Sequence, residues 1–343
     1  MRALFFERHG GNEVLQIGDR PEVPAGRGEV RIRVRAAALN HLDIFVRDGL
    51  PNVAVPLPQI PGADAAGEIE SIGEGVEGLT LGDRVLVQPG LYCNTCEFCR
   101  AGEQSLCLCF GILGEHVAGT FAELVTLPAR NVFPMPSRLT FEQAAAFPLV
   151  YQTAWRMVVG RAEARPGSTV LIHGIGGGVA GAALEIALLC GARVFVTSRS
   201  EEKLAWAREA GAEQAWNSTR EDVSRAVAAA TDKRGCDIVI DSVGEATWMT
   251  SLKAVARGGR IVTCGATSGP NPKEEMRLIF WKQFAILGST MGNDREFRAL
   301  LSAVDSGRLT PRVDSVYPLE KAREAYARME AGHQAGKIVL AVG

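Results

Sequence analysis

The stretch that decides the fold is His173-Gly-Ile-Gly-Gly-Gly-Val-Ala-Gly181, between an apolar strand candidate at 170–172 and a helix candidate at 182–189. Glycines at such a turn let the backbone approach a pyrophosphate, whose charge is met by N–H groups at the start of the helix. A second strand candidate ends at 197–199, about 20 residues further along, which is the spacing of a dinucleotide-binding unit. The stretch therefore predicts nucleotide binding, with a purely structural turn as the alternative.

Outward from this turn, apolar strands alternate with helices. The strand candidates are 170–172, 194–197, 214–216, 238–241, 260–264 and 285–287, and the helix candidates between them are 182–189, 201–210, 221–230 and 247–255. Continuous apolar strands that alternate with helices indicate a parallel sheet covered on both faces. Six strands are what a complete doubly wound dinucleotide-binding domain requires, so we predict an α/β fold.

The first third of the chain has a different pattern of apolar and polar residues. Val30, Ile32 and Val34 alternate with arginines, as in a strand with one wet face, and further short strands fit 67–72 and 83–88. This pattern predicts a small antiparallel barrel or sandwich. One helix is expected over 141–159, and two helices (294–304 and 319–330) and a last strand (337–342) follow residue 292.

The end of the second strand bears on the choice of cofactor. An unphosphorylated ribose is usually bound by an acidic residue there, but this chain has Ser198, Arg199 and Lys203. A hydroxyl and two cations suit a 2′-phosphate, so NADPH is favoured and NADH remains possible. The alternative is that Arg199 and Lys203 belong to a solvated helix start.

Composition excludes several classes of protein. The 343 residues include 37 Lys and Arg against 39 Asp and Glu, which gives no general electrostatic reason to bind nucleic acid or an acidic membrane. No stretch approaches the roughly 18 uninterrupted apolar residues of a membrane span. The apolar start is too short for a signal peptide, so a soluble cytoplasmic protein is expected.

Five of the eight cysteines fall between residues 93 and 109. The four candidate ligands, at spacings that match a closed tetrahedral zinc site, are Cys93, Cys96, Cys99 and Cys107. We expect one structural zinc, because four thiolates leave no coordination position for a substrate. Cys109 is either a spare or an alternative fourth ligand. Nearby acidic residues disfavour a nucleic-acid-binding zinc ribbon.

With these motifs in place, the chain resembles the medium-chain dehydrogenase/reductase superfamily over essentially its full length. The resemblance also rests on Gly62-Ala-Asp-Ala-Ala-Gly67 and Gly82-Asp-Arg-Val85. It implies a GroES-like β-barrel catalytic domain (1–150, with the zinc loop 93–107), completed by 290–343, and an inserted Rossmann domain (151–289). The cysteine loop is similar to that of zinc-type alcohol dehydrogenases, and the glycine turn to that of the quinone oxidoreductase branch.

The sequence departs from that family where zinc alcohol dehydrogenases hold a catalytic zinc. Asn40, Ala63 and Leu149 align with the three ligands, and Leu42 aligns with the hydroxyl of the proton relay. Asn40-His-Leu-Asp43 instead resembles the Asn-x-x-Asp of quinone and enone reductases, in which the Asn lies beside the nicotinamide. The resemblance thus implies Asn40 and Asp43 as catalytic residues, with Asp43 orienting its neighbours.

His41 aligns with a basic residue near the pyrophosphate. Loop capping is the alternative for Asn40 and His41, and a substitute metal site of His41, Asp43 and Asp64 is a further one. The family places further cofactor contacts at Thr153, Gly174, Gly176, Gly177, Gly178, Val179, Val243, Gly265, Ala266, Gly288, Ser289 and Thr290. The proton donor is unassigned, with Tyr151, His41 or water as candidates.

The resulting hypothesis is an NAD(P)-dependent oxidoreductase that transfers hydride between nicotinamide and a small carbonyl, enone or quinone. A homodimer or homotetramer, formed through the strand at 285–287, is implied by the resemblance. Two alternatives stay open: a zinc-dependent alcohol dehydrogenase with unusual ligands, and a nucleotide-binding protein without enzymatic activity.

Overall fold

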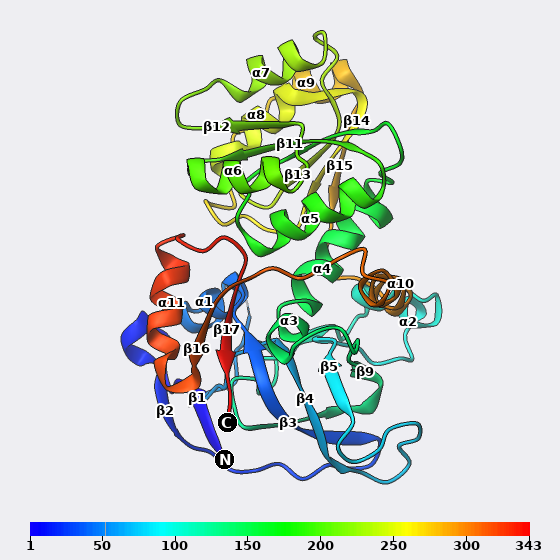
Figure 1. The fold of residues 1–343 in the computed structure, drawn as a ribbon. Helices are drawn as coiled ribbons and strands as arrows, with labels where there is room; N and C mark the ends of the chain where they lie inside the picture. Colours follow the sequence, from blue (N-terminus) through cyan, green and yellow to red (C-terminus); the bar gives the residue numbers. More distant parts are fainter. Residues whose placement is uncertain (52) are drawn as a thin grey trace. The chain divides into compact units, whose positions relative to one another are not determined.

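The computed structural model describes residues 1–51 and 53–343 and divides the chain into two compact units. The first unit consists of residues 1–149 together with 293–343, and the second consists of residues 150–292. The two ends of the chain therefore fold into one unit, and the second unit is inserted between them in the sequence, as the colours of Figure 1 show.

The second unit is built on a six-stranded sheet whose paired strands are all parallel. Its strands, in chain order, are β10 (Thr169–Ile172), β11 (Arg193–Ser198), β12 (Gln214–Asn217), β13 (Cys236–Asp241), β14 (Val255–Thr263) and β15 (Ala285–Gly288). The spatial order is β12-β11-β10-β13-β14-β15. This order confirms the predicted doubly wound sheet, and it reverses between β10 and β13, where such sheets bind their ligands.

Helices cover both faces of this sheet (Figure 1). They are α5 (Gly178–Leu189), α6 (Glu201–Glu209), α7 (Val223–Ala230), α8 (Glu245–Ala254) and α9 (Met276–Lys282). Trp248 and Leu252 of α8 pack with Leu171 and Val239 of the sheet in one buried cluster. Burial on both faces explains why the strands read as unbroken apolar runs in the sequence.

The first unit is built on a mostly antiparallel sheet of order β16-β17-β3-β4-β5-β9, with β8 paired to β3. Its strands are β3 (Glu29–Ala38), β4 (Asp64–Ile72), β5 (Arg84–Val87), β8 (Leu124–Pro128), β9 (Val132–Pro134), β16 (Val313–Pro318) and β17 (Lys337–Ala341). Strand β17 pairs with β3, with Val339 opposite Ala38. The end of the chain thereby completes a sheet that its beginning starts.

Smaller elements surround this sheet. They are the strand pairs β1 (Arg2–Phe5) with β2 (Gln16–Asp19) and β6 (Gly90–Leu91) with β7 (Gly111–Ile112), and the helices α1 (His41–Asp48), α2 (Glu97–Arg100), α10 (Asp294–Asp305) and α11 (Ala322–Glu330). Short 3-10 turns are η1 (Asn12–Val14), η2 (Gln104–Leu106), η3 (Ala129–Asn131) and η5 (Leu319–Lys321). Val30, Ile32 and Val34 point into the core, as their alternation predicts.

The single helix expected over 141–159 is wrong. The structure has α3 (Phe141–Ala145), then α4 (Pro148–Trp155), then a π-helical turn, η4 (Arg156–Arg161). Pro148 begins α4, where its missing N–H leaves no helical hydrogen bond unmade, and the same ring could not continue a helix from α3.

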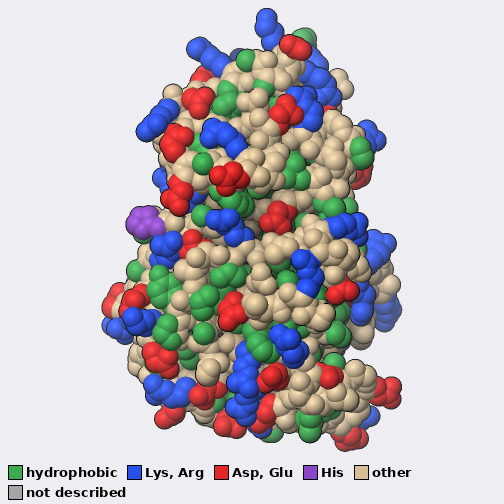
Figure 2. All heavy atoms as spheres, viewed as in Figure 1, with side chains coloured by type: hydrophobic (Ala, Val, Ile, Leu, Met, Phe, Trp, Pro, Cys, Tyr) green, Lys and Arg blue, Asp and Glu red, His purple; other side chains and the backbone are tan. Residues whose placement is uncertain are grey.

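The surface carries charges of both signs. On the face drawn in Figure 2, basic and acidic side chains are interspersed over the molecule. None of the helices in the described part of the chain is long and apolar enough to cross a membrane.

Candidate functional site

The glycine turn of the second unit connects β10 to α5 at the reversal of strand order. Gly174 and Gly176 have φ of +74° and +105°, which favour glycine. A Cβ at Gly176 would lie 2.3 Å from Cδ of Lys203. Gly177 is the N-cap of α5 and no side chain caps that end, so the first N–H groups of the helix are left for a ligand. This cradle fits a pyrophosphate.

Ser198, Arg199 and Lys203 lie beside this turn but differ in exposure. The buried hydroxyl of Ser198 donates to the carbonyl of Ile175 at 3.3 Å, and this hydrogen bond stabilises the glycine turn. Arg199 is exposed, and Lys203 is half-buried in the first turn of α6, against Gly176. The hydroxyl of Ser198 is therefore bonded within the turn, and Arg199 and Lys203 are the charged groups of this set.

The loop after β13 faces the glycine turn from the other side of the reversal. Asp241 is buried, and its Oδ1 accepts the N–H of Val243 at 2.9 Å and that of Gly244 at 3.1 Å. A Cβ at Gly174 would lie 3.0 Å from Val243 Cγ2, so the two loops are in contact. Sequence reasoning missed Asp241; its signal is an acidic residue at the end of an apolar strand.

The remaining candidates of the second unit lie at strand ends or on α4. Thr153 is buried with its Oγ1 3.7 Å from the sulfur of Met291, and Tyr151 donates its hydroxyl to Glu185 at 3.0 Å. After β14 and β15, Gly265, Gly288 and Thr290 are exposed and Ala266 is half-buried. Ser289 is buried, and its hydroxyl has no hydrogen-bond partner among the residues that the structure describes.

In the first unit, Asn40 and Asp43 sit at the start of α1, and His41 there is exposed. Asp43 accepts the N–H of Asn40 at 2.7 Å and that of Gly62 at 3.0 Å. Burial, which outweighs these hydrogen bonds, raises the pKa of Asp43 to about 7. Asp43 thus joins the start of α1 to the segment before β4.

Asn40 belongs to a buried polar cluster with Asp64 and Lys337, which we call the Asn40 cluster. Lys337 Nζ donates to Asn40 Oδ1 at 2.6 Å and to Asp64 Oδ2 at 3.1 Å. Asn40 Nδ2 donates to Asp64 Oδ2 at 2.9 Å and to the carbonyl of Ala38 at 3.3 Å, so both of its protons are bonded within the protein. The N–H of Leu149 donates to Asp64 Oδ1 at 2.8 Å.

Sequence reasoning did not single out Lys337. Its signal is a charged residue at the first position of an otherwise apolar strand, and this strand pairs with the one that ends at Ala38.

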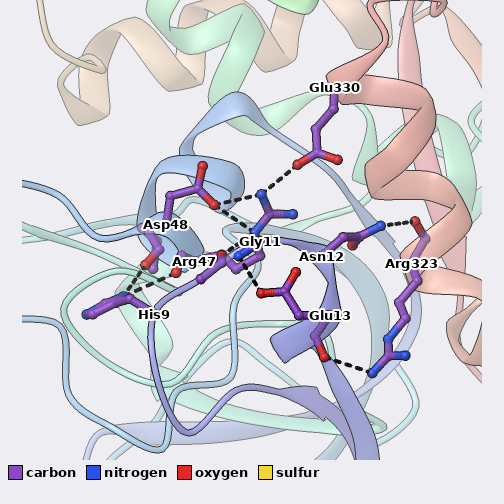
Figure 3. Close-up of polar contacts among 10 residues, drawn as sticks. His9, Gly11, Asn12, Glu13, Arg47, Asp48, Arg323 and Glu330 are labelled. Carbon is purple, nitrogen blue, oxygen red and sulfur yellow. Dashed lines mark hydrogen bonds and ion pairs between the residues drawn. The ribbon is translucent and has the colours of Figure 1, made fainter.

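The other end of α1 is anchored by Arg47 (Figure 3). Its guanidinium donates to the carbonyl of Gly10 at 3.2 Å, to Asp48 and to Glu330 of α11, the latter two at 2.6 Å. Figure 3 shows the N-terminal turn, α1 and α11 meeting at this side chain. Arg47 is fully buried, so this network holds the helix that carries Asn40 and Asp43 in place.

The four predicted zinc ligands come together. The Sγ atoms of Cys93, Cys96, Cys99 and Cys107 all lie within 4.8 Å of one another, with 3.5 Å between Cys107 and Cys93. A tetrahedral zinc with bonds of about 2.3 Å needs sulfurs about 3.8 Å apart, so the group fits structural zinc. Cys109 is exposed and lies outside the group.

The four thiols differ in their surroundings, and their pKa values differ as a result. Hydrogen bonds from Thr95 and Cys96 lower the pKa of Cys93 to about 5, whereas burial raises the pKa of Cys99 to about 12. Zinc binding therefore has to displace a proton from Cys99. Within the described residues, His41, Asp43 and Asp64 form no such metal-binding group.

Two family models match the chain: "Alcohol dehydrogenase GroES-like domain" over residues 26–137 and "Zinc-binding dehydrogenase" over residues 178–306. Rat (Rattus norvegicus) quinone oxidoreductase is 31% identical, covering 99% of this chain and 97% of its own, and acryloyl-coenzyme A reductase of Metallosphaera sedula is 33% identical over 99% of both. A solved NAD-dependent alcohol dehydrogenase is 45% identical, with a TM-score of 0.97 over 100% of both chains. The chain therefore belongs to the medium-chain superfamily of zinc-type alcohol dehydrogenases and quinone oxidoreductases, and it is an NAD(P)-dependent oxidoreductase that acts on small molecules.

Proposed function

We propose that this protein transfers a hydride from NADPH to a conjugated carbonyl compound, an enone or a quinone, without a catalytic zinc. The observation that carries the proposal is the Asn40 cluster. The positions that align with the three zinc ligands are Asn40, Ala63 and Leu149, and none of them offers a thiolate or an imidazole. The Asn40 amide is already bonded to Lys337 and Asp64.

The class of acceptor follows from the chemistry. Oxidation of an unactivated alcohol in this family relies on a Lewis acid, which these residues do not hold. A conjugated acceptor needs less activation by a Lewis acid, because its π electrons move onto the carbonyl oxygen as the hydride reaches the β-carbon. The enolate formed from an enone takes one proton at the α-carbon and becomes the saturated ketone, whereas a quinone that accepts the hydride and one proton becomes the hydroquinone. Bound NADPH supplies the hydride and leaves as NADP⁺.

The chain's own residues would orient the acceptor and the cofactor and provide a positive electrostatic potential. We assign Asn40 and Asp43 to the acceptor side and the glycine turn to the pyrophosphate. Positive potential and N–H groups fixed in advance stabilise the charge that develops on the oxygen. Proton delivery has no assigned residue: Tyr151 donates its hydroxyl to Glu185, His41 is exposed, and water is the third candidate.

The preference for NADPH is assigned to Arg199 and Lys203. Arg199 follows β11 directly and Lys203 lies in the first turn of α6, and β11 itself ends in Ser198 instead of the carboxylate that usually accepts the ribose hydroxyls of NADH. The test is kcat/KM with each cofactor for wild type, Arg199→Ala and the exposed control Arg225→Ala. We expect Arg199→Ala to lower the NADPH value about tenfold and to leave the NADH value within about threefold. A wild-type enzyme that prefers NADH by about tenfold or more contradicts the assignment.

A second candidate is the oxidation of an alcohol with NAD⁺, which the 45% identity to an NAD-dependent alcohol dehydrogenase favours. A panel of enones, quinones, aldehydes and alcohols with both cofactors, together with zinc analysis, separates the two. The proposal predicts about one zinc per chain and turnover of 3-penten-2-one or 1,2-naphthoquinone. About two zincs per chain with alcohol turnover establishes the second candidate instead.

We also propose that the enzyme forms a homodimer or homotetramer through β15. This strand ends the sheet order, and Ile286 on it is 38% exposed. The neighbouring helix α9 exposes Phe280 (64%) and Trp281 (67%), which are large apolar side chains for a surface. An unpaired edge beside exposed apolar groups suits association with another copy. Light scattering coupled to gel filtration tests this, and a monomer contradicts it.

A further inference from the structure

Lys337 is a lysine whose charged group is buried in the first unit. Its side chain is 5% exposed, and its partner Asp64 is fully buried. A buried charge is retained only where it is paired, and here the pair is completed by the amide of Asn40. The antiparallel pairing of β17 with β3 brings Lys337 to Asn40 across 297 residues of sequence. The ammonium is therefore placed by the register of the central sheet.

The three positions that align with zinc ligands converge on Asp64. Asn40 Nδ2 and the N–H of Leu149 each donate to one of its oxygens, at 2.9 Å and 2.8 Å, and Ala63 is its neighbour in sequence. The donor set does not fit a zinc ion. Ala63 and Leu149 have no ligand atom, and Asn40 Oδ1 already accepts from Lys337. The positive charge at this place is the Lys337 ammonium.

The same contacts allow one orientation of the Asn40 amide. In the observed orientation Oδ1 faces the ammonium, and Nδ2 faces the Asp64 carboxylate. A flipped amide would turn its two protons toward the ammonium and its oxygen toward the carboxylate, so both contacts would become repulsive. Lys337 and Asp64 thus both favour the observed orientation of the amide.

We propose that Lys337 is a positioning residue for hydride transfer: with Asp64 it fixes the Asn40 amide, and its ammonium is the positive end of this neutral pair. The inference rests on the proposed function, in which negative charge develops on the acceptor oxygen. A charge held in a site shielded from water acts more strongly than one in solvent and needs no rearrangement during the reaction.

The first test is Lys337→Met, which removes the charge and keeps much of the side-chain volume. With NADPH and 3-penten-2-one we expect kcat to fall about 100-fold, while both KM values stay within about threefold. The matched control is Lys321→Met, because Lys321 lies in the same unit but is 57% exposed and pairs only with Glu324 in the described structure. A kcat of Lys337→Met within about threefold of that of the control overturns the inference.

Loss of Lys337 also leaves Asp64 buried without its cation, so a folding defect has to be separated from a functional one. The double variant Lys337→Met/Asp64→Asn removes both charges. We expect its melting temperature to return toward that of the wild type while kcat stays low. If kcat recovers to within about threefold of wild type, Lys337 serves only to neutralise Asp64, and the inference is wrong.

A cycle with Asn40→Ala tests whether Lys337 acts through the amide. Once the amide is gone, Lys337→Met is expected to lower kcat by less than about tenfold further, because its main target is missing. If the loss of kcat in the double variant equals the product of the losses in the two single variants, Lys337 and Asn40 act independently, and the positioning role is wrong.

Failure of the proposed function has a different signature. A wild-type enzyme that turns over only alcohols with NAD⁺ contradicts that function, and the same variants then test Lys337 in the alcohol reaction. About two zincs per wild-type chain would overturn the inference about Lys337 directly.

Discussion

Two polar clusters of the first unit, the four cysteines and the Asn40 cluster, are built in opposite ways. The cysteine cluster comes from one loop, residues 93–107, and its four sulfurs converge within 4.8 Å. The Asn40 cluster joins residues 40, 64 and 337, which come from three separate segments of the first unit, and its cation belongs to the chain. The first centre depends on loop geometry and a metal, and the second depends on the register of β17 against β3.

This difference has an energetic counterpart. The four cysteines have to ionise to hold a metal, so the cysteine cluster would gain its stability from zinc. The Asn40 cluster is already neutral as a pair of opposite charges with an amide between them, so it needs no ion. Removing one member should therefore affect metal content in the first region and protein stability in the second.

The largest effect is expected for Cys99→Ser. A buried serine is a poor zinc ligand, and structural zinc sites contribute about 10 kcal/mol or more of binding free energy, so bound zinc should fall from about one per chain to well below half. The measurements are zinc content by mass spectrometry and protease sensitivity of the loop. Cys109→Ser is the control and should retain its zinc, because Cys109 is exposed and outside the cluster. Loss of zinc from the control would show that Cys109 is a ligand.

A smaller effect, measured here as protein stability, is expected for Asp64→Leu. The variant leaves the Lys337 ammonium buried without its carboxylate, which costs about 3–5 kcal/mol of unfolding free energy. Adding Lys337→Met should recover most of that loss, because a well-packed apolar pair can replace a buried ion pair. Calorimetry of the two variants measures this. A loss below about 1 kcal/mol for Asp64→Leu would mean that water reaches the Asn40 cluster.

The comparison also explains what the sequence could predict. The doubly wound sheet and the four zinc ligands follow from local patterns: apolar strands between helices, glycines after a strand, and cysteines at short spacing. The Asn40 cluster does not follow, because no local pattern specifies which residue of β17 lies opposite the end of β3. The break at Pro148 in the expected helix 141–159 was readable from the proline itself.

The last effect is expected from pH, and it tests whether water reaches the residues around the Asn40 cluster. Burial raises the pKa of Asp43 from its ordinary value of 3.8 to about 7, although hydrogen bonds from Asn40 and Gly62 and the charge of Lys337 oppose this. Between these two values the folded protein holds a proton that the unfolded chain has released. The contribution of Asp43 to stability is therefore fully present below about pH 4 and is lost as pH rises toward 7.

Asp43→Asn removes this dependence and adds a constant cost from its altered hydrogen bonds. The unfolding free energy of the variant relative to wild type should rise between pH 4 and pH 7 and then level off, with a slope of at most about 1.4 kcal/mol per pH unit. A difference that stays flat across this range would mean that Asp43 is ionised throughout, with its charge balanced by Lys337 and the two N–H donors. The Asn40 cluster would then extend to a second carboxylate, and its single ammonium would serve both.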